Sequence, residues 1–353
     1  MRFITKIHSV TGLVSGIFIL ILSVSGTLLL FFDSIDALQQ PKVGSNIEKR
    51  ILPVDSCYEI VQHKYPHAII SSCSMPENEQ QPFSFIVYDS SYLLGTKALQ
   101  VFLHPQTGAV LKTRGGSEDI KNNFMAWLSA FHSSFHAGKT GEWLLGFFAI
   151  VFLLSIITGI ILYRKNILAV LLFSSAVWKK NNWHQVIGTW ALLFNLMIGI
   201  TGFWMQRYVF KKEFYKVYTW TSTFKPSTGL FFNFDSAYAG LKKKYPDFTG
   251  YVIYFAQSKK TKTAVYGSNS TNAFIHSKKL ADVISLDSTG AIAKTRFINE
   301  IPAGDRYDII NSQLHMGKYG GATITIIYSL FGLSSALLSI TGFLLWVRRR
   351  KKS

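Results

Sequence analysis

Residues 10–32 read VTGLVSGIFILILSVSGTLLLFF, without one aspartate, glutamate, lysine or arginine. Three further runs that lack these charged residues cover 143–163, 185–206 and 319–347. A helix that crosses a lipid bilayer needs about 20 consecutive, predominantly apolar residues. The four runs therefore predict an α-helical membrane protein with four transmembrane helices, which excludes a single soluble domain.

The charges of the chain support the same interpretation. Of the 353 residues, 48% are hydrophobic and only 16% are charged, and the formal net charge is +18. An average soluble protein has about 25% charged residues. Basic residues cluster beside the predicted helices: Arg2 and Lys6; Arg164, Lys165, Lys179 and Lys180; Arg348, Arg349, Arg350, Lys351 and Lys352. Because cytoplasmic loops are rich in lysine and arginine, we expect both termini in the cytoplasm and a lipid bilayer around the helices. The basic residues lie beside helix ends rather than in one stripe that would follow a phosphate backbone, so we expect no nucleic-acid partner.

The two halves of the sequence are copies of each other. One constant shift in numbering superimposes residues 6–26 on 182–202, and a second superimposes 132–159 on 315–342. The repeating unit is a helix, an external module and a second helix. Both copies begin on the same side of the membrane, so the repeats are parallel rather than inverted.

These runs divide the chain into eight parts. In order, they are transmembrane helix 1 (1–32), external module 1 (33–125), a histidine-bearing segment with helix 2 (126–163), a cytoplasmic loop (164–182), helix 3 (183–206), external module 2 (207–311), a second histidine-bearing segment with helix 4 (312–347) and a basic cytoplasmic tail (348–353). Within the cytoplasmic part, the apolar run 167–178 is too short to span a bilayer and indicates an interfacial or re-entrant segment.

Each external module is predicted to be a small α+β domain. The first has helical spacing over 55–65 and strand-like stretches, rich in β-branched and aromatic residues, at 83–88, 98–103 and 109–113. The second repeats this pattern, with a helix over 235–245 and strands near 251–256, 263–266 and 280–286. Cys57 and Cys73 both lie in the first module, and the sequence is compatible with a disulfide or with two free thiols.

Five of the nine histidines flank the predicted membrane helices, where an ionisable side chain is costly and therefore indicates function. His8 and His184 stand at the cytoplasmic ends of helices 1 and 3, whereas His132 and His315 precede helices 2 and 4 on the outer side. Imidazole is a ligand of haem iron. The sequence therefore predicts two haems, one between each histidine pair. The sequence has no CxxCH motif, so covalent c-type attachment of these haems has no support.

Other interpretations of these histidines remain open. The duplication could have copied structural histidines that form hydrogen bonds between helices, or ligands of a non-haem metal. His136 follows His132 by one helical turn and aligns with Tyr319. We treat His136 as a contact of the haem propionates, a substrate-side residue or an alternative ligand. No nucleotide-binding GxGxxG or GxxxxGK[ST] motif is present, so electrons must come from a partner protein or from quinol.

The segments around these histidines resemble the PepSY-associated transmembrane helix family, the iron-regulated inner-membrane proteins that include ferric-siderophore reductases. The matching residues are His8 with Gly12, Phe131-His132 with Gly138, Trp183 to Gly188, Leu314 to Gly317, Thr341 to Arg349, and the Thr-Gly turns at 107–108 and 289–290. The resemblance covers nearly the whole chain. It implies four helices in a bacterial inner membrane, with two periplasmic PepSY modules.

In the reductase members of this family, two b-type haems carry electrons outward to siderophore-bound iron. The resemblance thus implies a haem-dependent ferric-siderophore reductase. Its axial iron ligands would be His8 and His184, and His132 and His315, with His136 beside the outer pair. Its partners would be a ferric siderophore and an electron donor, either a cytosolic reductase or quinol. Two alternatives remain: a non-enzymatic PepSY membrane anchor or regulator, and a quinol-linked dihaem oxidoreductase with another acceptor.

Overall fold

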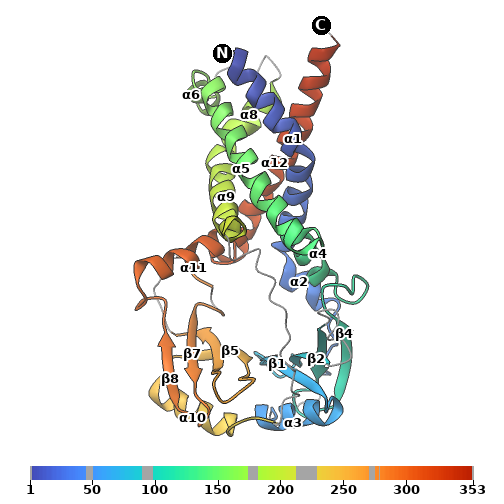
Figure 1. The fold of residues 1–353 in the computed structure, drawn as a ribbon, viewed down its shortest axis with the longest axis vertical. Helices are drawn as coiled ribbons and strands as arrows, with labels where there is room; N and C mark the ends of the chain where they lie inside the picture. Colours follow the sequence, from blue (N-terminus) through green and yellow to red (C-terminus); the bar gives the residue numbers. More distant parts are fainter. Residues whose placement is uncertain are drawn as a thin grey trace. The chain divides into compact units, whose positions relative to one another are not determined.

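The computed structural model describes residues 2–44, 51–89, 98–173, 182–211, 229–269, 275–277 and 279–351. The chain forms two compact units, each built from both sequence halves (Figure 1). The first, which we call the helical unit, comprises Met1–Phe32, Leu128–Tyr218 and Ile310–Ser353. The second, the sheet unit, comprises Asp33–Trp127 and Thr219–Ile309.

The short apolar run 167–178 is only partly described. Its first part forms the short helix α6 (Ile167–Leu171), and residues 174–178 lie outside the described residues.

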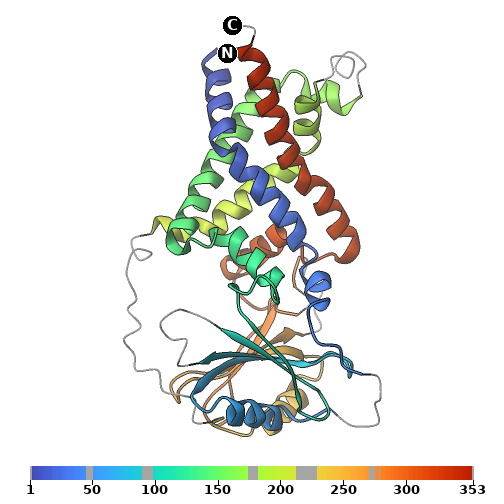
Figure 2. The same ribbon diagram turned by 90° about the vertical axis from the view of Figure 1, so that its right-hand side faces the viewer.

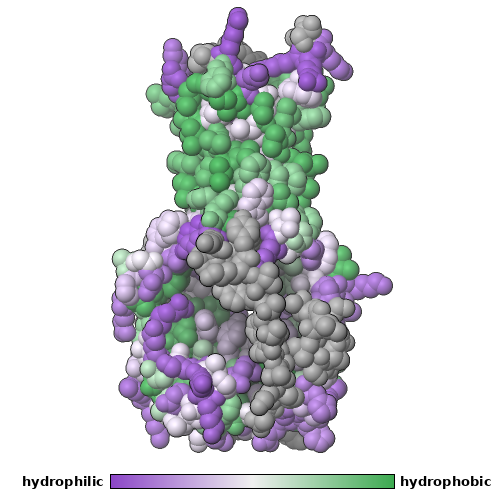
Figure 3. Space-filling model, in the orientation of Figure 1, coloured by the Kyte–Doolittle hydropathy of each residue, from purple (hydrophilic) through white to green (hydrophobic). Residues whose placement is uncertain are grey.

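Three helices of the helical unit are long and apolar enough to cross a membrane: α1 (Arg2–Leu29), α5 (Gly138–Tyr163) and α12 (Gly321–Arg350). Helix α1 packs against both α5 and α12. The surface of this unit is hydrophobic over its middle and hydrophilic at the end that carries both chain termini (Figure 3). This band is the surface expected of helices in contact with lipid, and the prediction of membrane helices is confirmed for these three.

The third predicted helix is broken. Residues 183–206 form α8 (Trp183–Trp190) and α9 (Leu192–Gln206), which continues into a short 3₁₀ helix (Arg207–Phe210), with a bend of 65° between the two parts. At the break, the N–H of Ala191 bonds to the carbonyl oxygens of Ile187 and Thr189. The two parts together make a fourth candidate span only if the bent pair is counted as one.

Two shorter helices precede α5 and α12 and carry the outer histidines. They are α4 (Phe124–Ser134) and α11 (Ala303–Met316). Between α4 and α5 the backbone turns sharply, with positive φ angles at Phe135, His136 and Gly138. Gly141 is required there, because a Cβ at this position would lie 1.7 Å from the carbonyl oxygen of Ser134.

The sheet unit contains one antiparallel sheet of eight strands. Their order is β4-β3-β2-β1-β5-β6-β7-β8, with four strands from each half of the sequence. The strands are β1 (Ala68–Ser74), β2 (Phe83–Asp89), β3 (Leu99–Leu103), β4 (Val110–Gly115), β5 (Thr249–Tyr254), β6 (Thr263–Ser268), β7 (Asp282–Leu286) and β8 (Ile292–Arg296). The two predicted α+β modules are therefore fused, because β1 pairs with β5 in the middle of the sheet.

Two helices, α3 (Val54–Lys64) and α10 (Phe234–Lys244), cover one face of this sheet (Figure 2). The core between them is rich in fully buried aromatic side chains, including Phe83, Phe85 and Phe248. Cys57 and Cys73 also lie in this core as free thiols. Burial raises the pKa of Cys57 to about 12, so this thiol stays protonated and unreactive at neutral pH.

The N-termini of α3 and α10 cap each other. The Asp55 carboxylate accepts hydrogen bonds from the backbone N–H groups of Phe234 (2.9 Å) and Asp235 (2.8 Å). The Asp235 carboxylate accepts bonds from Val54 (3.0 Å) and Asp55 (2.8 Å). Partial burial and the hydrogen-bonded Asp235 carboxylate raise the pKa of Asp55. Each half of the sheet unit thus satisfies N–H groups that the other half's helix leaves unpaired.

Replacing Asp235 with alanine is expected to lower the free energy of unfolding of the sheet unit by about 1–3 kcal/mol, because two backbone N–H groups lose their acceptor. Asp235→Asn keeps one acceptor oxygen and should lose less. The measurement is urea unfolding of the full chain in detergent, followed by limited proteolysis of the sheet unit. Asp247→Ala, at an exposed aspartate of the same unit, is the matched control, and equal stabilities of the two alanine variants would refute this role.

Candidate functional site

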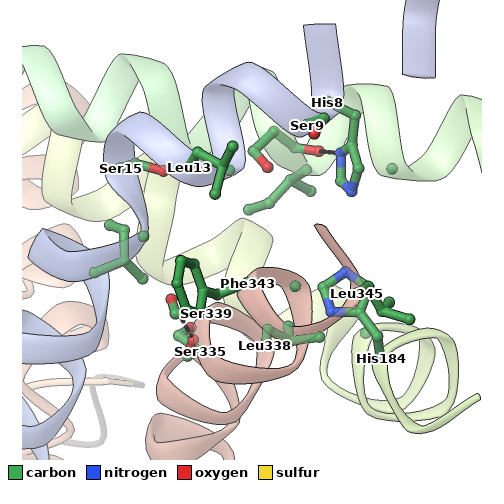
Figure 4. A pocket seen from close by; sticks show the side chains of 18 of the residues that line it. His8, Ser9, Leu13, Ser15, His184, Ser335, Leu338, Ser339, Phe343 and Leu345 are labelled. Carbon is green, nitrogen blue, oxygen red and sulfur yellow. Dashed lines mark hydrogen bonds between the residues drawn. The ribbon is translucent and has the colours of Figure 1, made fainter. Parts of the chain in front are cut away.

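The inner pair consists of His8 on α1 and His184 on α8. Their ring centroids are 6.2 Å apart and their planes are inclined by 69°. A bond between a metal and an imidazole nitrogen measures about 2 Å, so two imidazoles on opposite sides of one metal place their centroids about 6 Å apart. The pair therefore has the spacing of two ligands of a single metal ion, and Figure 4 shows the two rings on opposite walls of a pocket.

This pocket is a cavity of about 640 Å³ between α1, α5, α8 and α12. Its volume falls within the range of cofactor and ligand sites, about 300–1,000 Å³. Gly12, Gly16 and Gly188 line it, and they leave room for a flat group beside the histidines. The lining also includes the guanidinium-bearing Arg349 and the buried amide of Gln185.

The outer pair consists of His132 on α4 and His315 on α11, both in the helical unit. Burial lowers the pKa of each to about 4, and for His132 the neighbouring His315 contributes to the shift. Both imidazoles are therefore neutral near pH 7, which is the form that binds a metal. A second cavity of about 260 Å³ lies beside this region, lined by Ser25 and Phe131 among others.

All four histidines make the same contact with a neighbouring helix. In each, Nδ1 lies within hydrogen-bond distance of a Ser or Thr hydroxyl. The pairs are His8 with Thr158 (3.1 Å), His184 with Thr341 (2.9 Å), His132 with Ser25 (2.8 Å) and His315 with Thr201 (3.0 Å). This contact fixes the orientation of each ring and engages Nδ1, which leaves Nε2 as the nitrogen for a metal.

A glycine follows each of these hydroxyl residues and packs against the imidazole. A Cβ added there would lie 3.0 to 3.3 Å from Cε1 of the histidine, at Gly159 for His8, Gly342 for His184, Gly26 for His132 and Gly202 for His315. A side chain in place of the glycine would crowd the ring and require it to shift by a few tenths of an ångström. We call each combination of hydroxyl residue, glycine and histidine a Ser/Thr-Gly-His contact.

The hydroxyl residues Ser25, Thr158, Thr201 and Thr341 are the part of the site that the sequence prediction missed. The repeat had already aligned their Ser-Gly and Thr-Gly pairs. Nothing in the sequence connected them with the histidines, because each contact joins residues more than 100 positions apart. The fourfold repetition of the contact is the signal that identifies them.

His136 is not part of this fourfold pattern. It follows α4 in a left-handed backbone conformation (φ 55°), and its ring centroid lies 6.2 Å from that of Phe131. The repeated contact on α4 is made by His132. Among the described residues, no group of three or more His, Cys, Asp or Glu side chains forms a metal site, so each histidine pair offers two protein ligands.

Comparisons with known proteins give one finding on the family. A search of curated proteins found no match. The family model described as the PepSY-associated TM region matches residues 5–349, which includes all four helices that bear or contact the inner histidines and both short helices of the outer pair. The sequence resemblance is thereby confirmed: this chain is a multi-pass membrane protein that belongs to the PepSY-associated TM region family.

Proposed function

We propose that this protein is a dihaem electron-transfer protein of a bacterial inner membrane that reduces the iron of ferric siderophores on the periplasmic side. The observation that carries the proposal is the Ser/Thr-Gly-His contact, made four times. Hydrogen bonds of this kind orient the histidine ligands of metals. A b-type haem with two imidazole ligands exchanges single electrons and keeps no open coordination position for oxygen.

His8 and His184 are the proposed ligands of the inner haem. Their 6.2 Å spacing and the 640 Å³ cavity between them support this role. A haem b also carries two carboxylates, which need donors. Arg349 lines the cavity, and Nε2 of Gln185 is buried without a hydrogen-bond partner among the described residues. These two side chains are suited to bind the carboxylates, and Nε2 of Gln185 would then donate a hydrogen bond to one of them.

His132 and His315 are the proposed ligands of the outer haem, with His136 as a further side chain nearby. The two pairs lie at different levels of the helical unit. His8 belongs to α1 itself, and His132 contacts α1 at Ser25. A helix rises 1.5 Å per residue, which places about 25 Å between these levels. The pairs therefore suit transfer of charge along most of a hydrocarbon core of about 30 Å.

The direction of transfer follows from the proposed topology. The basic clusters at the chain termini favour a cytoplasmic location for that end of the helical unit. The sheet unit, inserted after α1 and after α9, then lies in the periplasm. The net reaction moves one electron from a cytosolic reductase or from quinol to Fe(III), which is released as Fe(II). Release follows because hard oxygen ligands hold Fe(III) more tightly than Fe(II).

The experiment that tests this proposal uses the purified protein in vesicles of known orientation. After reduction of the protein, a ferric siderophore added on the sheet-unit side is expected to reoxidise both haems. The same chelate added on the side of the termini should not. Reoxidation from the side of the termini would contradict the proposal.

In the same assay His136→Ala should retain both haems, because the repeat aligns His132, not His136, with His315.

Removing one hydroxyl should weaken one haem site selectively. Thr341→Val keeps the shape of the side chain but removes the hydrogen bond to His184, and loss of such a bond costs about 10–100-fold in metal affinity. We expect the inner haem to be lost more readily on dilution and its midpoint potential to change, while the outer haem is unaffected. Thr323→Val, at an exposed threonine of α12, is the control. Equal haem retention in both variants would contradict the role of Thr341.

A further inference from the structure

The sheet has a second face, opposite to the one that α3 and α10 cover. Side chains alternate between the faces of a strand. Ile253, Val265 and Ile284 point into the helix-covered core, so Tyr254, Tyr266 and the other neighbours in sequence belong to the second face. We call this the open face. Tyr254, on a central strand of the sheet, is 48% exposed there.

The open face is basic. The alternating strand positions on this face include Lys112 and Arg114 on β4, and Lys294 and Arg296 on β8, but no aspartate or glutamate. Within the described part of the chain, the acidic side chain that pairs with a cation of this face is Asp36, which belongs to α2 (Phe32–Ala37). An open face with this charge attracts anions.

The duplication provides an internal comparison of the two arginines. Arg114 and Arg296 occupy the same place in the repeated sequence Lys-Thr-Arg. Arg114 is buried and forms an ion pair with Asp36, with Nη2 and Oδ2 2.8 Å apart. Among the residues that the structure describes, Arg296 has no ion pair and is half-buried at the edge strand.

Two tyrosines lie on the same face of the sheet as Arg296. Tyr266 shares a row across the strands with Val283 and Arg296, and its ring centroid is 5.2 Å from that of Tyr254. Two strand spacings separate Tyr266 from Arg296, which is about 10 Å. The row that runs from Tyr254 to Lys294 has small side chains between its ends, Ala264 and Ser285. This part of the open face therefore has aromatic rings at one end and two cations at the other.

We propose that this part of the open face, formed by Tyr254, Tyr266, Lys294 and Arg296, binds anionic ferric chelates whose donor groups are aromatic, as in a tricatecholate. Arg296 and Lys294 pair with the negative charge of the chelate, because among the described residues no carboxylate forms an ion pair with either of them as Asp36 does with Arg114. The tyrosine rings pack against its aromatic donors. This inference rests on the proposed function, and it names the class of substrate and the surface that holds it.

The test measures binding without reduction. Full-length protein in detergent is equilibrated by dialysis against a gallium tricatecholate, which carries three negative charges, or an uncharged gallium trihydroxamate. Gallium(III) resembles Fe(III) in charge and size but is not reduced under these conditions. Binding is therefore independent of haem content, and failure of the redox proposal would not be mistaken for failure of this one.

We expect the tricatecholate to bind at least about 10-fold more tightly than the trihydroxamate. Arg296→Gln should weaken its binding by about 10-fold or more, the loss of one charge-assisted contact. Arg296→Lys should retain most of the affinity because it keeps the charge, and Tyr254→Ala should also weaken binding. Lys260→Gln, at an exposed lysine outside this part of the open face, is the matched charge control. Equal affinities for the two chelates, or equal affinities of Arg296→Gln and Lys260→Gln, would overturn the proposal.

Discussion

Replacing His184 with alanine is expected to remove one haem completely and to leave the other in place. His8→Ala should give the same spectrum as His184→Ala, because the two imidazoles face each other at 6.2 Å across one cavity. Each of these variants removes one of the two histidines that would hold the inner haem, so the haem would be bound more weakly and the spin state of any retained iron would change. The variants are compared by visible spectroscopy and by haem content per chain.

The outer pair should behave in the same way. His132→Ala and His315→Ala are expected to remove the second haem, and both variants should keep the one that depends on His8. His67→Ala, at an exposed histidine of the sheet unit, is the control and should keep both. If His8→Ala and His184→Ala lost spectroscopically different haems, the pairing would be wrong. Loss of the outer haem in His136→Ala but not in His132→Ala would show that the other histidine is the ligand.

The largest effect on stability is expected at Arg114. Its guanidinium pairs with Asp36, donates to Oε1 of Gln100 at 2.9 Å and to the carbonyl oxygen of Asn122 at 3.1 Å, and lies 5.1 Å from the centre of the Phe102 ring. Arg114→Met leaves the buried Asp36 carboxylate without a cationic partner, although Oδ2 still accepts a hydrogen bond from Nε2 of Gln40 at 2.8 Å. Breaking a buried ion pair in this way costs about 3–5 kcal/mol.

The internal duplication again supplies the control for this prediction. Arg296→Met changes the same residue of the second copy, which forms no ion pair with the described residues, and should cost less than about 1 kcal/mol. The double variant Asp36→Leu with Arg114→Met removes both charges and should recover part of the loss. Urea unfolding followed by proteolysis of the sheet unit measures all three. Similar stabilities of Arg114→Met and Arg296→Met would refute the importance of this pair.

The sequence predicted the membrane helices well because their signal is local. A run without charged residues, such as 319–347, is sufficient to indicate a span. The break at Ala191 was missed because the run 185–206 continues through it without a proline or a charged residue. The bend lies where the N–H of Ala191 bonds to two carbonyl groups, and the sequence has no breaker residue that marks this position.

For the sheet, the sequence predicted most strands but not how the two halves pair. Six of its strands coincide with predicted stretches, but the pairing of β1 with β5 was not predicted. Strand β1 reads AIISSCS, in which three serines obscure the apolar alternation. Its pairing with β5 also joins segments about half a chain apart, and no local pattern specifies such a contact. The same reason hid Ser25 and Thr201, whose histidine partners lie 107 and 114 positions away.

The central claim is that each histidine pair holds one haem. The most direct measurement is the haem content of the purified full-length protein, determined as the pyridine haemochrome against protein concentration. The account predicts two non-covalent b-type haems per chain and a reduced b-type α band. A ratio near one would contradict the two-site arrangement, and a protein purified without haem, which cannot be reconstituted with it, would contradict the redox function altogether and favour a membrane anchor or regulator.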